Sequence, residues 1–327
     1  MPSEHVLGLE DCASDCLALV GGKATSLGNM LRQGLQVPPG FAVSVAAYRE
    51  HVAHNNLVSD LERLVADCTT YEAQLRASEQ IRELFEASTP APAVEDEVRR
   101  AYEALCDDPT MPVAVRSSAT AEDMADASFA GQQETYLWIM GADEVLRHVL
   151  RCWSSLFTPQ AIAYRAHLKT PVTDLAMGVV VQRMVPAEAA GVMLTIDPIT
   201  GDRSTIIIEA AYGLGAAVVN GEVEPDRFCI DKNGMSVRAR TTGVKTVAYR
   251  FDPAVQGTNL TEVPAELQGK PCVTDEEMIG LAQLGKRMEE TMGRTQDIEW
   301  AMGPDRQIYL LQARPETVWS RIASATS

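Results

Sequence analysis

Two short β-like segments in the last quarter of the chain carry side chains suited to phosphate chemistry. They read DIEWAM and QIYLLQAR and flank residues 303–306 (GPDR), an order typical of a β-hairpin. If those four residues form the turn, Glu299 faces Leu310 and Asp297 faces Gln312. Side chains alternate along a strand, so the polar residues of both segments are predicted to share one face. These residues are Asp297, Glu299, Gln312 and Arg314.

This predicted face combines oxygen ligands with a cation. The carboxylate of Glu299 and the amide oxygen of Gln312 suit Mg²⁺, which keeps several waters and takes few protein ligands beside phosphates. Arg314 next to them can neutralise charge on a transferring phosphoryl group. An exposed sheet face that carries a salt bridge is the alternative interpretation, and the hairpin alone leaves both open.

A second polar segment follows an apolar strand in the middle of the chain. The run VAVRSSATAEDMADASFAGQQET places Arg116 at the end of the strand and a small-residue tip at Gly131, with Thr135 just beyond it. Backbone amides and hydroxyls of such a loop can wrap a triphosphate, and a guanidinium matches phosphate oxygens. An ordinary strand and turn with a surface arginine is the alternative.

Two further polar residues lie in contexts that favour a ligand. Lys23 follows two glycines and precedes a helical stretch, so it is predicted near a helix N-terminus, where an anion is stabilised. Gln182 interrupts the apolar run MGVVVQRMV and needs a polar partner, which a nucleotide or the backbone can supply. The P-loop and Rossmann motifs do not fit, because Ala24 and Val218 stand where these motifs need a hydroxyl residue and a glycine.

The elements that must position these residues are helices that alternate irregularly with short strands. From Val113 onward, β-rich runs broken by turn residues predict an antiparallel sheet, and the whole is an α+β organisation. Residues 55–107 show helical spacing with many charges and are predicted to form a solvated helical insert. Residues 244–272 are predicted to be an irregular loop, and residues 275–293 an amphipathic helix.

Bulk composition limits the class of protein. With 327 residues and 46% hydrophobic content, the chain is long enough for two domains or one domain in two lobes. A formal net charge of -17 disfavours nucleic acid and anionic membranes as partners. The acidic, polar start does not resemble a signal peptide, and no apolar run approaches the roughly 18 residues of a membrane span. We therefore expect a cytoplasmic protein that binds neither nucleic acid nor membrane.

Six blocks of the sequence resemble, in order, one known family. They are VGGKATSLGNML, VPPGFAVS, AVRSSATAEDMADASFAGQQET, VVQRMVPAEAAGVMLT, EAAYGLGAAVVNG and DIEW with IYLLQARPETVWS. Together they are similar to the N-terminal ATP-binding domain of phosphoenolpyruvate synthase (pyruvate, water dikinase), which pyruvate phosphate dikinase and rifampicin phosphotransferase share. The resemblance runs over nearly the whole chain and is weakest at about 55–107.

The resemblance implies an ATP-grasp-type domain of two lobes that binds ATP and Mg²⁺. Residues 1–190 would form the first lobe with the helical insert at about 55–107. Residues 191–318 would form the second lobe with the metal and phosphate hairpin, and 319–327 a tail.

Residue by residue, the resemblance assigns roles to the same side chains. It implies that Lys23 and Arg116 are phosphate-binding cations, and that Gly131 and Thr135 are phosphate-loop contacts. Gln182 becomes a nucleotide contact. Glu299 and Gln312 are implied as the Mg²⁺-associated pair. Arg314 is implied as the arginine at the transferred phosphate, and it forms the catalytic set with Lys23 and Arg116. Glu299 and Gln312 are separated by one residue more than is usual, which leaves the hairpin register open.

The implied activity is that of a dikinase-type phosphotransferase with paired acceptors. ATP would phosphorylate a histidine on a phosphohistidine-carrying domain or partner subunit, for onward transfer to an acceptor of the pyruvate, phenol or antibiotic class. A GGxxSHxA-like histidine motif is missing from these 327 residues, so we expect either a fragment of a longer enzyme or a separate subunit, as in phenylphosphate synthase. An ATP-binding regulatory module without turnover and a self-sufficient small-molecule kinase are the alternatives.

Overall fold

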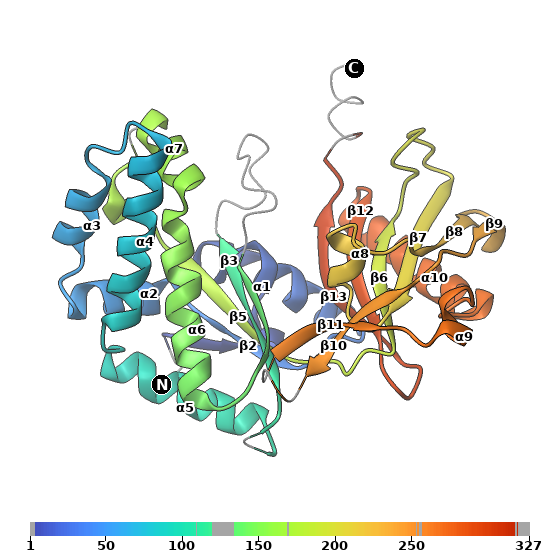
Figure 1. Cartoon of the computed structure of the whole chain (residues 1–327), viewed down its shortest axis with the longest axis horizontal. Coiled ribbons are helices and arrows are strands. Elements are labelled where there is room, and N and C mark those ends of the chain that lie inside the picture. Colours follow the sequence, from blue (N-terminus) through green and yellow to red (C-terminus); the bar gives the residue numbers. More distant parts are fainter. Residues whose placement is uncertain are drawn as a thin grey trace. The chain divides into compact units, whose positions relative to one another are not determined.

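The chain folds into two compact units (Figure 1), which a computed structural model describes for residues 4–108, 110–119, 134–168, 170–252, 254, 257–317 and 319. Unit 1 comprises Met1–Asn29 and Pro39–Met184, and unit 2 comprises Met30–Pro38 and Val185–Ser327. Both combine helices with antiparallel strands, so the predicted α+β class is confirmed. Across the described part of the chain, every helix is too short or too polar to cross a membrane.

Unit 1 is built on a five-stranded sheet with the order β1-β2-β5-β3-β4, in which all neighbours are antiparallel. The strands are β1 (Val6–Gly8), β2 (Gly40–Val43), β3 (Val113–Ala119), β4 (Thr135–Ile139) and β5 (Met177–Arg183). Alternate residues of the two central strands, such as Val115 and Val181, are fully buried in the main core cluster. The apolar runs therefore form the inner strands, as the sequence predicts.

Helices cover both faces of this sheet, and Figure 1 shows α4 and α6 on one side of β3 and β5 with α1 on the other. The helices that belong mainly to unit 1 are α1 (Leu17–Arg32), α2 (Val45–His54), α3 (Val58–Val65), α4 (Tyr71–Ala87), α5 (Pro92–Leu105), α6 (Ala142–Ser154) and α7 (Pro159–Leu168). The segment 55–107 is helical, as predicted. The prediction that it is solvated is wrong, because Leu61, Ile81 and Phe85 belong to the buried core. Its charges occupy only the outer faces of amphipathic helices.

Unit 2 is built on a six-stranded antiparallel sheet with the order β13-β12-β6-β7-β8-β9. The strands are β6 (Ala189–Leu194), β7 (Thr205–Tyr212), β8 (Asp226–Asp231), β9 (Ser236–Thr241), β12 (Gln296–Met302) and β13 (Ile308–Pro315), and the short helices are α8 (Ala216–Val219) and α9 (Ala265–Gln268). The long helix α10 (Asp275–Met292) begins at a capping box of Thr274 and Glu277 and ends at Gly293 in the left-handed conformation. Its buried residues include Met278, Leu281 and Met288, which confirms the predicted amphipathic helix.

The prediction of an irregular loop at 244–272 is wrong. Strands β10 (Val247–Asp252) and β11 (Gly257–Glu262) form a separate two-stranded antiparallel sheet there. Ala248 is fully buried, whereas most other residues of the two strands are half-buried or exposed. The error arises because the Gly and Pro residues of 258–271 favour a loop and outweigh the alternation of Val247, Tyr249 and Phe251 in β10.

Candidate functional site

The helix that carries Lys23 is kinked at Gly21, whose φ and ψ are 81° and 171°. A Cβ atom at Gly21 would lie 2.0 Å from the backbone oxygen of Ser118 in β3, so glycine lets α1 approach this strand. Lys23 follows the kink and so lies near the start of the helical part of α1, as predicted. Its side chain is buried, and Nζ donates a hydrogen bond of 2.8 Å to the backbone oxygen of Ser117.

Arg116 projects from β3 on the face that α1 covers. Val115 points into the helical core on the opposite face, and side chains alternate along the strand, so Arg116 and Ser118 share the α1 face. Only 7% of Arg116 is exposed, which rules out a surface arginine. Thr135 lies directly opposite Arg116 on β4 and is exposed.

Gln182 lies on the same face one strand away. Arg116 pairs with Val180 of β5, and Gln182 follows Val180 by two residues. The side chain of Gln182 is 2% exposed, which confirms the predicted burial of this polar group. Unit 1 therefore brings Lys23, Arg116, Thr135 and Gln182 to one side of its sheet, whereas Gly131 lies outside the described residues.

The hairpin of β12 and β13 exists as predicted, but its predicted register is wrong. Glu299 pairs with Gln312, and Asp297 pairs with Arg314. The register shifts between Glu299 and Trp300, because Trp300 pairs with Leu310, so one step along β12 corresponds to two steps along β13. The connection is also longer than the predicted turn at 303–306, since the last pair joins Met302 to Ile308.

The bulge brings the predicted ligands together. Glu299 is half-buried and lies opposite Gln312, which is 8% exposed. Ile298, the neighbour of Glu299, pairs with Met193 on the side covered by Gly285 of α10. The polar residues therefore point away from α10, on the other face of the sheet.

Asp297 also contributes to this face, although no role was predicted for it beyond its position there. Arg314 Nε and Nη2 lie 2.9 Å and 2.8 Å from Asp297 Oδ2. Burial raises the pKa of the Asp297 carboxyl above its ordinary value, and the charge of Arg314 opposes this effect. The salt bridge of the alternative interpretation is thus present. This ion pair lies beside the oxygen ligands Glu299 and Gln312. The predicted position of Asp297 on the same polar face as Arg314 was the sequence signal that could have revealed it.

The donor set of Glu299 and Gln312 fits Mg²⁺ but not a metal held by protein alone. Groups of three or more His, Cys, Asp or Glu side chains arranged to hold a metal do not occur among the described residues. A carboxylate and an amide oxygen are hard ligands, and Mg²⁺ takes its remaining ligands from water and phosphate. The pair is therefore suited to a metal that arrives with a phosphate ligand.

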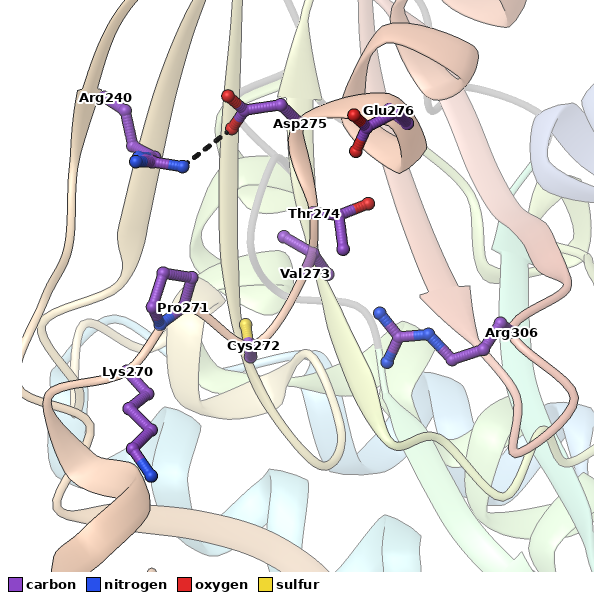
Figure 2. Close-up of a pocket in the computed structure, with 9 residues that line it drawn as sticks. All are labelled: Arg240, Lys270, Pro271, Cys272, Val273, Thr274, Asp275, Glu276 and Arg306. Carbon is purple, nitrogen blue, oxygen red and sulfur yellow. Dashed lines mark hydrogen bonds and ion pairs between the residues drawn. The ribbon is translucent and has the colours of Figure 1, made fainter.

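A separate cavity of about 610 Å³ lies at the start of α10 (Figure 2). Arg240, Lys270, Asp275 and Arg306 are among its lining residues, and none of the predicted site residues lines it. Figure 2 shows Arg240 pointing toward Asp275, and their closest atoms are 2.9 Å apart. Arg306 is paired with Glu277. Both arginines are thus paired with acids of α10.

Comparison with known proteins gives one consistent family. The family model described as "Pyruvate phosphate dikinase, AMP/ATP-binding domain" matches residues 17–327. A probable phosphoenolpyruvate synthase of Staphylothermus marinus is 38% identical over 96% of this chain and 41% of its own length. The phosphoenolpyruvate synthase of Aeropyrum pernix is 38% identical over 98% of the chain and 43% of its own length.

A relative with a different name matches equally well. The rifampicin phosphotransferase of a Streptomyces species is 42% identical over 97% of the chain and 36% of its own length. The chain thus spans less than half the length of these three relatives. Since the family model covers nearly the whole sequence and the relatives align along almost all of it, the chain belongs to the pyruvate phosphate dikinase AMP/ATP-binding domain family.

Proposed function

We propose that this chain binds Mg-ATP in an ATP-grasp-type domain and transfers a phosphoryl group to a histidine on a separate domain or partner subunit. The observation that carries the proposal is the bulged hairpin, which sets Glu299 opposite Gln312 beside the Asp297–Arg314 pair. Membership in an AMP/ATP-binding family supports the nucleotide. Oxygen ligands next to an arginine on one sheet face are the arrangement that phosphoryl transfer needs.

The residues of unit 1 hold the phosphates and the base in this proposal. Lys23 and Arg116 are buried cations on one side of the sheet, where low solvent exposure strengthens their attraction for phosphate oxygens. Thr135 offers a hydroxyl beside Arg116, and Gly131 belongs to the same phosphate loop. Gln182 contacts the nucleotide with its amide.

The residues of unit 2 act at the transferred phosphate. Glu299 and Gln312 would hold Mg²⁺, which neutralises phosphate charge when bound. Arg314 donates hydrogen bonds to the phosphoryl oxygens as charge develops, and Asp297 holds its guanidinium in place. In this proposal the residues of both units contribute to catalysis by positioning and electrostatic stabilisation.

A further domain or subunit completes the reaction in this proposal. The relatives are more than twice as long as the region they share with this chain, which leaves room for a phosphohistidine carrier and an acceptor site. Their names point to different acceptors, and we propose an acceptor of the pyruvate, phenol or antibiotic class. The proposed overall type is a dikinase, in which ATP gives one phosphoryl group to the histidine and one to water, so that AMP and phosphate are the nucleotide-derived products.

Nucleotide binding can be tested by the unfolding temperature of the purified chain with and without Mg-ATP. Ligand at about 100 times its dissociation constant adds roughly 2.7 kcal/mol to the folded state. We expect a clear upward shift for the wild type, a smaller one for Glu299→Gln, and none for the double variant Arg116→Ala/Glu299→Ala. Glu262→Gln, at the exposed end of β11, is the matched control and keeps the full shift. An unshifted wild type would contradict the proposed site.

Phosphoryl transfer needs a second experiment. The chain is mixed with the part of the Staphylothermus marinus relative that lies outside the shared region, and radiolabelled ATP is added. Label on that protein that is lost in acid and kept in alkali is the expected signature of phosphohistidine, with AMP as the nucleotide product. ADP formation by the chain alone with a small acceptor would instead favour the self-sufficient kinase, and binding without any turnover the regulatory module.

A further inference from the structure

The helix that carries Lys23 starts at a point where its own sequence provides no cap. The first N–H groups of a helix lack intrahelical partners and are normally satisfied by a side chain of the residue just before the helix. After the kink in α1, the residues at that position are Gly21 and Gly22, which have no side chain. The cap therefore has to come from another element.

Ser118 of β3 provides it. The hydroxyl of Ser118 accepts a hydrogen bond of 3.2 Å from the backbone N–H of Ala24, and Ser118 is fully buried. Gly21, where the helix kinks, is also bound by Thr25, whose hydroxyl donates a hydrogen bond of 2.9 Å to the backbone oxygen of Gly21. Gly21 is also the residue that could not carry a Cβ against Ser118. The N-terminus of this helix and the strand are thus fitted to each other.

Successive residues of β3 hold successive residues of α1. Ser118 binds the backbone of Ala24, while the backbone oxygen of Ser117 accepts from Lys23 Nζ at 2.8 Å. A lysine side chain has four rotatable bonds, and fixing both its helix and its ammonium removes most of that freedom before any ligand binds. Two anchors on one strand therefore set the direction of the Lys23 ammonium.

We propose that Ser118 is a positioning residue for Lys23, acting as a helix cap supplied from a distant strand. This inference rests on the proposed function, in which Lys23 binds phosphate. Ser118 contacts the helix backbone and acts on the nucleotide only through Lys23. Its removal should therefore weaken the binding of ATP by disordering Lys23, and should matter only while Lys23 is present.

The test compares Ser118→Ala with Ser44→Ala in the full chain. Ser44 is a matched control, because it is also fully buried and its hydroxyl accepts from Ala47 N–H at 3.3 Å at the start of α2. Each variant loses one helix cap and some thermal stability. We expect Ser118→Ala to raise the dissociation constant for Mg-ATP about fivefold to tenfold, the size of one lost hydrogen bond. Ser44→Ala should leave the dissociation constant within about twofold of the wild type, as expected for a site with no shared partners.

A double-mutant cycle separates positioning from general stability. Lys23→Met should weaken Mg-ATP binding, and adding Ser118→Ala to it should cause no further loss. Amide hydrogen exchange at Ala24, measured without nucleotide, should be faster in Ser118→Ala and unchanged in Ser44→Ala. If amide exchange at Ala24 is the same in Ser118→Ala as in the wild type, Ser118 does not cap this helix. If Ser118→Ala weakens ATP binding as much in Lys23→Met as in the wild type, the positioning role is wrong.

Failure of the proposed function is visible separately. If the wild-type chain does not bind Mg-ATP, or if Lys23→Met binds it as well as the wild type, Lys23 has no phosphate to bind and the positioning role falls with it. The exchange rate at Ala24 still reports the cap in that case, because it needs no ligand. If wild type and Lys23→Met differ as expected while Ser118→Ala binds like wild type, the proposed function stands and this inference alone is wrong.

Discussion

Arg314 donates a hydrogen bond of 2.9 Å from Nε to Asp297 Oδ2, and its Nη2 lies 2.8 Å from the same oxygen. The two residues are cross-strand partners only because the bulge after Glu299 shifts the register of the hairpin. The predicted register would have placed Gln312 opposite Asp297 instead. The same shift therefore creates both the Arg314–Asp297 pair and the Glu299–Gln312 pair.

Replacing Asp297 by Asn should release Arg314 without changing the size of the side chain at position 297. Arg314 is half-exposed, so its guanidinium would then sample several directions. We expect the affinity for Mg-ATP to change little and the turnover of bound ATP to fall by up to about a hundredfold, as misplaced catalytic groups do. Turnover should also fall in acid at a higher pH than for an ordinary aspartate, because burial raises the pKa of Asp297 and protonation removes its charge.

Asp231→Asn is the control for this substitution. It breaks another ion pair of the same sheet, in which Arg238 lies 2.7 Å from Asp231. Turnover in this variant should match the wild type. Unchanged turnover in Asp297→Asn, measured side by side, would show that Arg314 needs no such partner.

Gly21→Ala should destabilise the chain much more than Gly34→Ala. Both glycines have positive φ, 81° and 71°, so alanine is strained at either site. At Gly34 nothing lies within 4 Å of the added Cβ, and we expect a loss of about 1 kcal/mol. At Gly21 the added atom meets the backbone of β3, which cannot move aside, and at least about 2 kcal/mol more should be lost. Chemical denaturation of the two variants measures the difference, and equal losses would contradict the close approach of α1 to β3.

Lys245→Met should be strongly destabilising, because it leaves the buried carboxylate of Asp226 without its cation. The two side chains are 0% and 1% exposed, and their charged atoms are 2.5 Å apart. Breaking one side of such a pair costs about 3–5 kcal/mol. Arg63→Met removes a pair of similar length, 2.6 Å, that is largely exposed, and should cost less than about 1 kcal/mol. Urea unfolding of both variants provides the comparison, and similar losses would mean that burial does not matter here.

The free energy of unfolding should fall in mild acid because of His51. Burial, and to a smaller extent His54, lowers the pKa of His51 to about 4. The unfolded chain takes up a proton near pH 6.5 that the folded chain does not, so stability is full above that pH and is lost progressively down to about pH 4. This one group accounts for on the order of 3 kcal/mol of the loss.

His51→Gln should therefore flatten the dependence of unfolding free energy on pH between about 6.5 and 4. The exposed His167, replaced by Gln, is the control and should leave the slope as it is in the wild type. Both are measured by urea unfolding at several pH values. A slope that persists in His51→Gln would place the acid-sensitive group elsewhere.

The sequence by itself determined most of the local helices and strands and indicated the candidate site residues. Short β-rich runs broken by turn residues located β3, β5, β6 and β7, and helical periodicity located α10, because both patterns arise within a few consecutive residues. It also indicated that Lys23 follows a turn into a helix, that Gln182 is buried, and that a hairpin carries Glu299 and Gln312. The β10–β11 hairpin was missed because the Gly and Pro residues of 258–271 favour a loop.

Only the tertiary structure decided the pairings between distant segments. Strand β12 is held on its other side by β6, where Glu299 and Trp300 pair in regular register with Val192 and Gly191. The extra residue is therefore taken up by β13, the outermost strand of the sheet, and this places Gln312 opposite Glu299. In the same way, the cap of Ala24 comes from Ser118, 94 residues away along the chain. Alternation and turn residues fix which side chains share a face, but register and remote caps depend on the neighbouring strand that the folded chain supplies.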